Sequence, residues 1–141
     1  MTGRTVAPFG GAKLAILSGG AVVTLLRDAD PAIPWPGFWD LPGGGREGGE
    51  TPRDCALRET REEVGLIVPR AAIVWERRRP RPGGETVFLV ALWPGLGTDA
   101  LRLGDEGQEA RLMPIAEFLC REDAVPMFQT DLAAYLAAER G

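Results

Sequence analysis

Three glutamates in one short stretch, Glu59, Glu62 and Glu63, have the residue type and spacing that metal chemistry requires. Positions i, i+3 and i+4 of a helix share one face, so the three carboxylates would lie side by side. Like charges at this spacing destabilise a helix by roughly 0.2–0.5 kcal/mol per pair. A divalent cation would offset that repulsion, and carboxylate oxygens favour Mg²⁺ or Mn²⁺ over zinc. The alternative is a solvated helix face, with Arg58 balancing Glu62 as an i,i+4 pair.

The flanking residues predict the helix that would carry these acids. Thr51 suits the N-cap, Pro52 suits the first helical position, and Asp54 lies three residues after the cap. Gly65 supplies a residue that readily adopts the left-handed conformation with which helices commonly end. We therefore expect one helix between Thr51 and Gly65, with an acidic face and a face that packs against the protein, formed by Ala56, Leu57, Thr60 and Val64.

The spacing around the acids forms a wider pattern. Gly44 is followed after five residues by Glu50, and after seven more by the run RETREEVGL that starts at Arg58. This pattern resembles the signature box of the Nudix hydrolases at every fixed position, while Thr60 occupies a slot that is usually aliphatic. Chance agreement at the fixed positions is on the order of one in a million. The resemblance continues in the segment FWDLPGGG before the box and in EGQ, which begins at Glu106.

The resemblance implies an α+β class and the Nudix fold, a mixed β-sheet sandwiched between α-helices (an α/β/α sandwich). It also implies a divalent-metal-dependent hydrolase that splits the pyrophosphate of nucleoside diphosphate-linked compounds by attack of water on phosphorus. Mg²⁺ or Mn²⁺ would be the cofactor, and a small-molecule nucleotide the substrate. The alternative of another class is a catalytically silent nucleotide-binding module. Such modules typically lose box acids, and this chain keeps them.

The resemblance also assigns roles within the box. Glu59, Glu62 and Glu63 would be metal ligands, together with the backbone carbonyl of Gly43. Glu59 or Glu63 would also be the general base, and Arg58 would hold a box carboxylate in place. Structural roles fall to three residues of the box: Gly44, Glu50, which would bond back to the loop, and Gly65.

Glu106, outside the box, is the candidate for an additional metal ligand or an alternative base. In the MutT-type nucleoside triphosphate pyrophosphohydrolases, a Glu-Gly-Gln in a loop after the box supplies such a glutamate. Its neighbours Asp105 and Glu109 would replace it if the loop is shifted.

The EGQ segment and the compact size favour a MutT-like triphosphatase that releases a nucleoside monophosphate and pyrophosphate. The chain contains no Asn, whereas readers of oxidised guanine in the family use an Asn before a late proline; here Ala124 and Val125 precede Pro126. ADP-ribose or another nucleoside diphosphate sugar is the main rival substrate, because Pro82 lies about sixteen residues past the box, as in ADP-ribose hydrolases. A dinucleoside polyphosphate is disfavoured, because the expected tyrosine is missing and the only Tyr is Tyr135.

Two further side chains are candidates for substrate binding. Trp35 lies in a proline-containing loop and could stack on a nucleobase, or it could cap the core with its aromatic neighbours. Arg79 belongs to a basic cluster and could bind a substrate phosphate. The alternative is that these arginines protect an edge strand, and strand alternation lets at most half of them reach one site. The cluster consists of Arg77, Arg78, Arg79 and Arg81.

Length and composition set the broad class. A chain of 141 residues is most simply a single Nudix domain over 1–141, large enough to bury about two-thirds of its unfolded surface. A net charge of −4 argues against binding a nucleic acid polymer. The absence of a long apolar run, a signal peptide and a disulfide framework predicts a cytoplasmic protein without membrane association. The chain has no His, which excludes imidazole bases. Dimers are common in the family, so a homodimer is an expectation that only the resemblance supports.

Hydrophobic runs and turn residues predict the other elements. Residues 13–17 and 21–27 form a hairpin around Ser-Gly-Gly, 28–37 form a loop, and 73–79 and 86–93 form strands that flank the turn PRPGGE. We expect a short strand over 110–113, a short helix over 114–119 and a loose lead-in over 1–11. A longer helix over 126–140 would have an apolar side formed by Leu132, Tyr135 and Leu136.

Overall fold

The computed structural model describes residues 9–82 and 84–140. Within them the chain forms seven strands: β1 (Phe9–Ser18), β2 (Ala21–Leu26), β3 (Trp39–Asp40), β4 (Gly43–Gly45), β5 (Ile73–Arg81), β6 (Gly84–Leu92) and β7 (Glu109–Pro114). The described α-helices are α1 (Pro52–Val64), α2 (Ile115–Cys120) and α3 (Pro126–Arg140). Short 3₁₀ segments, η1 and η2, lie at Arg70–Ala72 and Thr98–Ala100.

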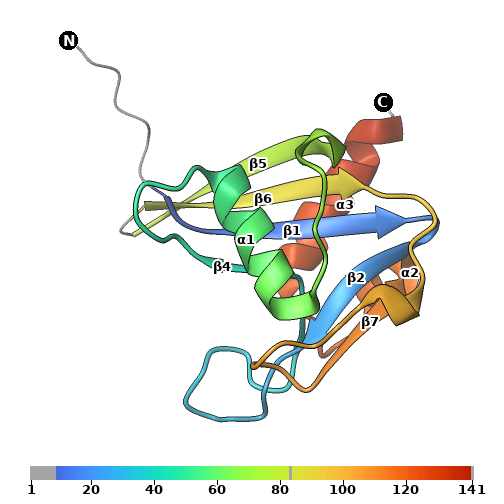
Figure 1. The fold of residues 1–141 in the computed structure, drawn as a ribbon, viewed down its shortest axis with the longest axis horizontal. Helices are drawn as coiled ribbons and strands as arrows, with labels where there is room; N and C mark the ends of the chain where they lie inside the picture. Colours follow the sequence, from blue (N-terminus) through green and yellow to red (C-terminus); the bar gives the residue numbers. More distant parts are fainter. Residues whose placement is uncertain (1–8, 83, 141) are drawn as a thin grey trace.

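The strands form one mixed sheet in the order β3-β2-β1-β6-β5, with β4 paired to β1 and β7 paired to β2 (Figure 1). The central pair, β1 and β6, is parallel, with Leu14 opposite Leu89. The other pairings are antiparallel. Parallel strands must be joined by a long crossover, and here the segment that contains α1 and β5 makes that connection.

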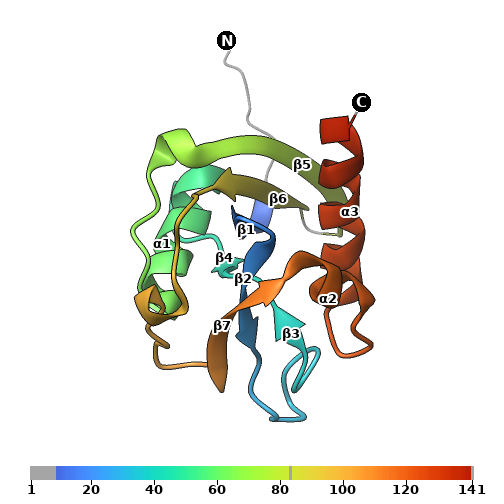
Figure 2. The ribbon, with the colours of Figure 1, turned by 90° about the vertical axis from the view of Figure 1, so that its right-hand side faces the viewer.

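Helices cover both faces of the sheet, with α1 on one side and α2 and α3 on the other (Figure 2). The central strands are buried on both faces, and their sequences are therefore continuous runs of apolar residues. Alternation sends Leu14 and Ile16 of β1 into the core beneath α1, and Ala15 and Leu17 into the core beneath α2 and α3. This arrangement confirms the predicted α+β class and the α/β/α sandwich. That residues 1–141 form a single domain stays a prediction.

The local signals around α1 are confirmed. The Thr51 side chain accepts a hydrogen bond from the Asp54 N–H at 3.2 Å, and Pro52 begins the helix. Gly65 ends it with φ +74° and donates its N–H to the Arg61 carbonyl. The face toward the sheet contains buried Cys55, Ala56, Thr60 and Val64, with Leu57 packed against the same core.

Most of the other predicted elements are present, with several corrections. The first hairpin is confirmed, but β1 already begins at Phe9, so residues 9–11 are strand instead of lead-in, because Gly11 pairs with both Gly45 and Thr86. Residues 1–8 of the predicted lead-in, and Gly83 of the predicted turn, lie outside the described residues. The prediction missed β3, β4, η1 and η2, which are too short to show a hydrophobic period. In the described part of the chain, no helix has the length and apolarity to cross a membrane.

Candidate active site

The acidic face of α1 lies against Gly43–Gly45, which we call the glycine loop, because these residues have no side chains. A Cβ atom at Gly44 would lie 2.7–2.9 Å from the carboxylate atoms of Glu59. Gly43 has φ +140°, and a Cβ there would lie 2.2 Å from the Ala12 carbonyl oxygen. Glycine is therefore required at Gly43, and a side chain at Gly44 would force the Glu59 carboxylate to move, so the absence of side chains lets the loop and the helix approach each other closely.

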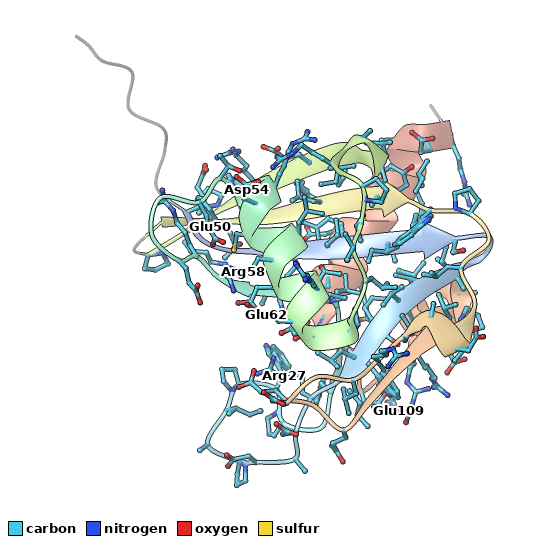
Figure 3. The ribbon with its side chains drawn as sticks, viewed as in Figure 1. Arg27, Glu50, Asp54, Arg58, Glu62 and Glu109 are labelled. Carbon is cyan, nitrogen blue, oxygen red and sulfur yellow. The ribbon has the colours of Figure 1, made fainter. Side chains whose placement is uncertain are left out.

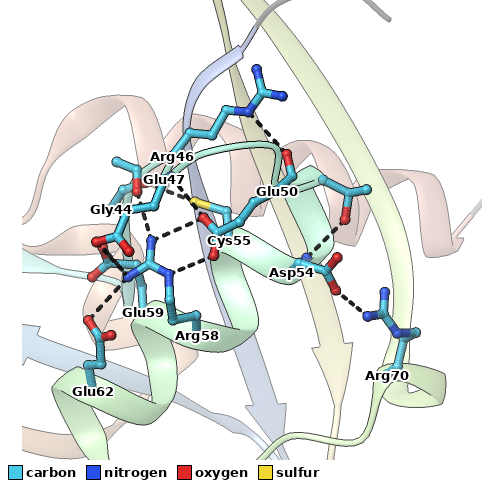
Figure 4. A network of polar contacts seen from close by, with 12 residues as sticks. Gly44, Arg46, Glu47, Glu50, Asp54, Cys55, Arg58, Glu59, Glu62 and Arg70 are labelled. Atoms are coloured by element: carbon cyan, nitrogen blue, oxygen red, sulfur yellow. Dashed lines mark hydrogen bonds and ion pairs between the residues drawn. The ribbon is translucent and has the colours of Figure 1, made fainter.

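Arg58 connects the loop to the acids of the helix (Figure 4). Its guanidinium donates two hydrogen bonds to Glu50, at 2.6 and 3.2 Å, and one to the Gly45 carbonyl at 3.0 Å. The remaining nitrogen, Nη1, lies 3.2 Å from both Glu59 Oε2 and Glu62 Oε1. The Arg58 guanidinium, aided by the Glu47 N–H, lowers the pKa of the Glu50 carboxyl. Arg58 thus holds two of the three carboxylates that the sequence singled out, Glu59 and Glu62. Glu50 bonds back to the loop as expected, by accepting from the Glu47 N–H at 2.9 Å.

Glu63 is held from the other side of the loop. The Gly43 N–H donates to Glu63 Oε1 at 2.8 Å. Burial raises the pKa of the Glu63 carboxyl to about 7, although the Lys13 ammonium and the Gly43 N–H both favour the charged form. Burial also raises the pKa of Glu59, an effect that Arg58 partly counteracts. Two adjacent carboxylates therefore lie in an environment that disfavours their own charge.

A cavity of about 440 Å³, which we call the acid cavity, is lined by carboxylates from α1 and from the loop before β7: Glu59, Glu62, Glu63, Asp105 and Glu106. Glu63 and Glu106 also line a second cavity beside it. Glu106 therefore faces the box acids, as the sequence predicted. Of its two proposed substitutes, Asp105 shares the acid cavity, whereas Glu109 lies in β7 paired with Leu26 and lines neither cavity (Figure 3).

The donor set suits a hard divalent cation, because a cavity lined only by carboxylates accumulates negative charge that a cation neutralises. The side chains are not gathered around one point, however. Over residues 9–82 and 84–140, no group of three or more acids and cysteines converges closely enough to hold an ion. Glu59 and Glu62 turn toward Arg58, and Glu63 turns toward the Gly43 N–H. The carbonyl of Gly43, a predicted ligand, accepts a hydrogen bond from Lys13 Nζ at 3.1 Å.

Sequence reasoning missed a charged group beside the acids, formed by Lys13, Arg27 and Asp40. Asp40 Oδ2 accepts from Lys13 Nζ at 3.0 Å and from Arg27 Nη1 at 2.9 Å, and the Asp40 side chain is only 3% exposed. Lys13 Nζ also donates to the carbonyls of Leu41 and Gly43. One signal could have indicated this group, since Lys13 is the only lysine in the sequence and lies within an apolar strand.

The two predicted substrate-binding side chains lie apart from the acids. Trp35 has φ +52°, is 39% exposed, and packs against Phe38 at 5.1 Å between ring centroids. Among the described residues, Trp35 lines neither the acid cavity nor the second cavity nor the third cavity introduced below. Ile33 of the same loop lines the second cavity. Arg79 forms an ion pair with Asp131 of α3 and lines a third cavity on the other side of Gly44.

Comparison with known proteins agrees with this geometry. The family model described as NUDIX domain matches residues 11–134. An 8-oxo-dGTP diphosphatase of Proteus vulgaris is 45% identical over 60 residues, which cover 40% of this chain and 54% of the relative. An ADP-ribose pyrophosphatase of Methanocaldococcus jannaschii is 32% identical over 84 residues, which cover 58% and 49% of the two chains. The matched segments thus span about half the length of these relatives.

Solved structures share the fold. The MutT protein of Methanosarcina mazei Go1 superimposes with a TM-score of 0.73 at 18% identity, covering 98% of this chain and all (100%) of that one. The E. coli ORF135 protein superimposes with a TM-score of 0.67 at 25% identity, covering 92% and 89%. A bifunctional NMN adenylyltransferase/ADP ribose pyrophosphatase from Francisella tularensis gives 0.69 at 21% identity, covering 98% and 44%. Since the family match extends over residues 11–134 of 141, the chain belongs to the Nudix domain family.

Proposed function

We propose that this protein is a divalent-metal-dependent pyrophosphohydrolase of MutT type, which converts a nucleoside triphosphate to a nucleoside monophosphate and pyrophosphate. The observation that carries the proposal is the acid cavity, whose lining in the described part of the chain consists of carboxylate residues from α1 and from the loop before β7. A polyphosphate substrate is itself negative, so a cation must lie between it and these side chains. Catalytically silent modules of the family typically lose box acids, and this chain keeps Glu59, Glu62 and Glu63.

Glu59, Glu62, Glu63 and Glu106 would hold Mg²⁺ or Mn²⁺, with the Gly43 carbonyl as a further ligand once Lys13 releases it. A bound cation supplies neutralisation of phosphate charge, alignment of the phosphorus and a lower pKa for the attacking water. The Arg58 guanidinium would position Glu59 and Glu62 instead of contacting substrate, because Glu50 and Gly45 already fix it. Gly44 leaves the space in which Glu59 can turn.

Glu63 is our first candidate for the general base. Burial raises the pKa of its carboxyl to about 7 in the metal-free protein, which suits a group that accepts a proton near neutral pH. Its hydrogen bond from the Gly43 N–H fixes the carboxylate without satisfying both oxygens. Glu59 is the second candidate, because burial raises its pKa in the same direction.

ADP-ribose is a second candidate substrate. It is supported by the similarity to the ADP-ribose pyrophosphatase of M. jannaschii, at 32% identity over 58% of this chain. The proposed chemistry is the same for both substrates, because each contains a pyrophosphate that water can split. Action on small nucleotides, a cytoplasmic location and a homodimer remain predictions.

The test is incubation of the purified protein with nucleoside triphosphates and, separately, with ADP-ribose, in Mg²⁺, in Mn²⁺ and in chelator. Products are separated by anion-exchange chromatography, so that pyrophosphate is distinguished from inorganic phosphate. We expect nucleoside monophosphate and pyrophosphate from a triphosphate, only when metal is present, and no product from Glu63→Gln. Release of single phosphates, or turnover unaffected by chelator, would contradict the proposal.

A further inference from the structure

A cavity of about 250 Å³ lies on the far side of the glycine loop, between the sheet and α3; we call it the apolar cavity. Its hydrophobic walls are Phe88 of β6 and Met127 and Phe128 of α3. The two phenylalanine rings lie 6.4 Å apart at an angle of 26°. Glycines of β1 and β4 form another part of the lining, so a flat ring can approach the backbone there.

One wall of the apolar cavity carries a buried charge. Asp131 of α3 lines the cavity, and its side chain is 5% exposed. Two arginines of β5 contact the same oxygen, Oδ1: Arg79 by a hydrogen bond, and Arg77 at 3.5 Å. Neither arginine contact involves Oδ2. Among the residues that the structure describes, the buried Nε of Arg79 has no acceptor. The wall thus offers a carboxylate acceptor next to a guanidinium donor.

The apolar cavity adjoins the catalytic carboxylates. Gly44 lines the cavity, and its Cα lies so near Glu59 that a Cβ would contact the carboxylate at 2.7–2.9 Å. Lys13 also lines the cavity, and it donates to the carbonyl of Gly43, whose N–H holds Glu63. A nucleotide with its base in the apolar cavity would therefore carry its phosphates toward the acid cavity.

We propose, on the basis of the function proposed above, that the apolar cavity binds the base of the nucleotide, and that Asp131 and Arg79 select guanine. Guanine presents two adjacent donors, N1–H and the 2-amino group, beside one acceptor, O6. A carboxylate accepts from both donors, and a guanidinium donates to the acceptor. Adenine and cytosine present a ring-nitrogen acceptor at the position of N1–H, and it would face the Asp131 carboxylate. The rings of Phe88 and Phe128 supply the apolar surface that any base requires.

A merely structural role makes a different prediction. An Arg79–Asp131 pair that only joins β5 to α3 would affect folding, and it would reduce the hydrolysis of all nucleotides by the same factor. A base-reading role changes the ratio between nucleotides. Ratios measured with one protein sample do not depend on how much of that sample is folded, so they separate the two roles even if the variant is less stable.

The test compares GTP, ITP and ATP as substrates of the wild type and of Asp131→Asn. ITP differs from GTP only by lacking the 2-amino group. In the wild type we expect kcat/KM to be highest for GTP and lower for ITP and ATP. In Asp131→Asn, kcat/KM for GTP should fall about 10- to 100-fold, mainly through KM, because hydrogen bonds to a charged group are lost. The kcat/KM for ITP should fall less, and that for ATP should change by less than about threefold, so the ratio of kcat/KM for GTP to that for ITP approaches 1.

The matched control is Asp123→Asn, which also removes an aspartate from a pair with an arginine, Arg121, but lines none of the described cavities. It should keep the wild-type ratios. Equal kcat/KM for all bases in the wild type, or ratios that Asp131→Asn leaves unchanged, would overturn the assignment of guanine.

A binding measurement separates failure of this inference from failure of the proposed function. Guanosine and inosine carry no phosphate, so their binding to metal-free protein, followed by NMR chemical-shift changes, needs no catalysis. Shifts at Phe88 and Phe128 that are stronger with guanosine, and that Asp131→Asn abolishes, would support the base site even if no triphosphate is hydrolysed. If triphosphates are hydrolysed but no such shifts are seen, the proposed enzymatic function stands and the base site is overturned.

Discussion

Replacing Glu63 by Gln should make the metal-free protein more stable while abolishing its activity. Gln has nearly the same size, and its Oε1 can keep the hydrogen bond that Glu63 accepts from the Gly43 N–H at 2.8 Å. What the change removes is a partly buried negative charge whose neighbours include Glu59 and Asp40. That charge is useful only when a cation is bound, so without metal it opposes folding.

The magnitude follows from the pKa of this carboxyl. Burial raises the pKa of the Glu63 carboxyl from 4.5 to about 7. At a pH where the group is ionised in both the folded and the unfolded protein, this shift lowers the free energy of unfolding by about 3 kcal/mol. Because the side chain keeps some contact with solvent, we expect a gain of about 1–3 kcal/mol for Glu63→Gln at pH 8. At a pH below the pKa that Glu63 has in the unfolded protein, the carboxyl is protonated in both states and does not reduce stability. The difference should therefore be near zero at pH 4.5 and grow as the pH rises toward 7 and above.

The assay is urea denaturation of wild type and variant in chelator between pH 4.5 and 8, followed by the same experiment with Mg²⁺. Magnesium should stabilise the wild type more than the variant, because it binds the folded state through the removed charge. The control is Glu62→Gln, whose native side chain is 57% exposed and should change stability by less than about 0.5 kcal/mol. Equal stability of Glu63→Gln and wild type at pH 8, or a difference independent of pH, would refute the reasoning.

Three further substitutions test other parts of the site. Arg58→Ala should reduce kcat by about 10- to 100-fold and change KM less, because it releases Glu59 and Glu62 without touching substrate; a pure KM effect in steady-state kinetics would contradict this. Glu106→Gln should reduce the rate or weaken metal dependence at least about tenfold, whereas Glu109→Gln, outside the acid cavity, should be silent in the same assay. Lys13→Met should cost about 1–3 kcal/mol in chemical denaturation, because buried Asp40 loses one partner, and wild-type stability would show that Arg27 alone suffices.

The sequence by itself determined the features that depend on local geometry. A helix places residues three and four apart on one face, so Glu59, Glu62 and Glu63 could be grouped without knowing the fold. The end signals of α1 at Thr51 and Gly65 are also local, and both are confirmed. The box spacing then indicated the family, and with it the mixed sheet between helices, which composition or periodicity could not have predicted.

The tertiary structure decided which side chains the acids meet. Lys13 and Asp40 are 27 residues apart, and Arg79 and Asp131 are 52 residues apart. Contacts at such separations depend on strand order and register. The pairings of β1 with β4 and of β2 with β3 bring Lys13 near Asp40, and no local period encodes those pairings. The sequence therefore suggested that Arg79 binds a phosphate, whereas the structure pairs it with a carboxylate of α3.

Trp35 lies outside the described cavities although its residue type indicates stacking. The 28–37 loop makes hydrogen bonds from Arg27 Nε to the Pro34 carbonyl at 2.8 Å and from the Gly37 N–H to the Asp28 carbonyl at 2.9 Å, and Trp35 packs against Phe38. Residue type and spacing specify which chemistry a chain can perform. Only the packing of distant segments specifies which of the chemically suitable side chains lie in one site, because the contacts that bring them together do not exist until the sheet has formed.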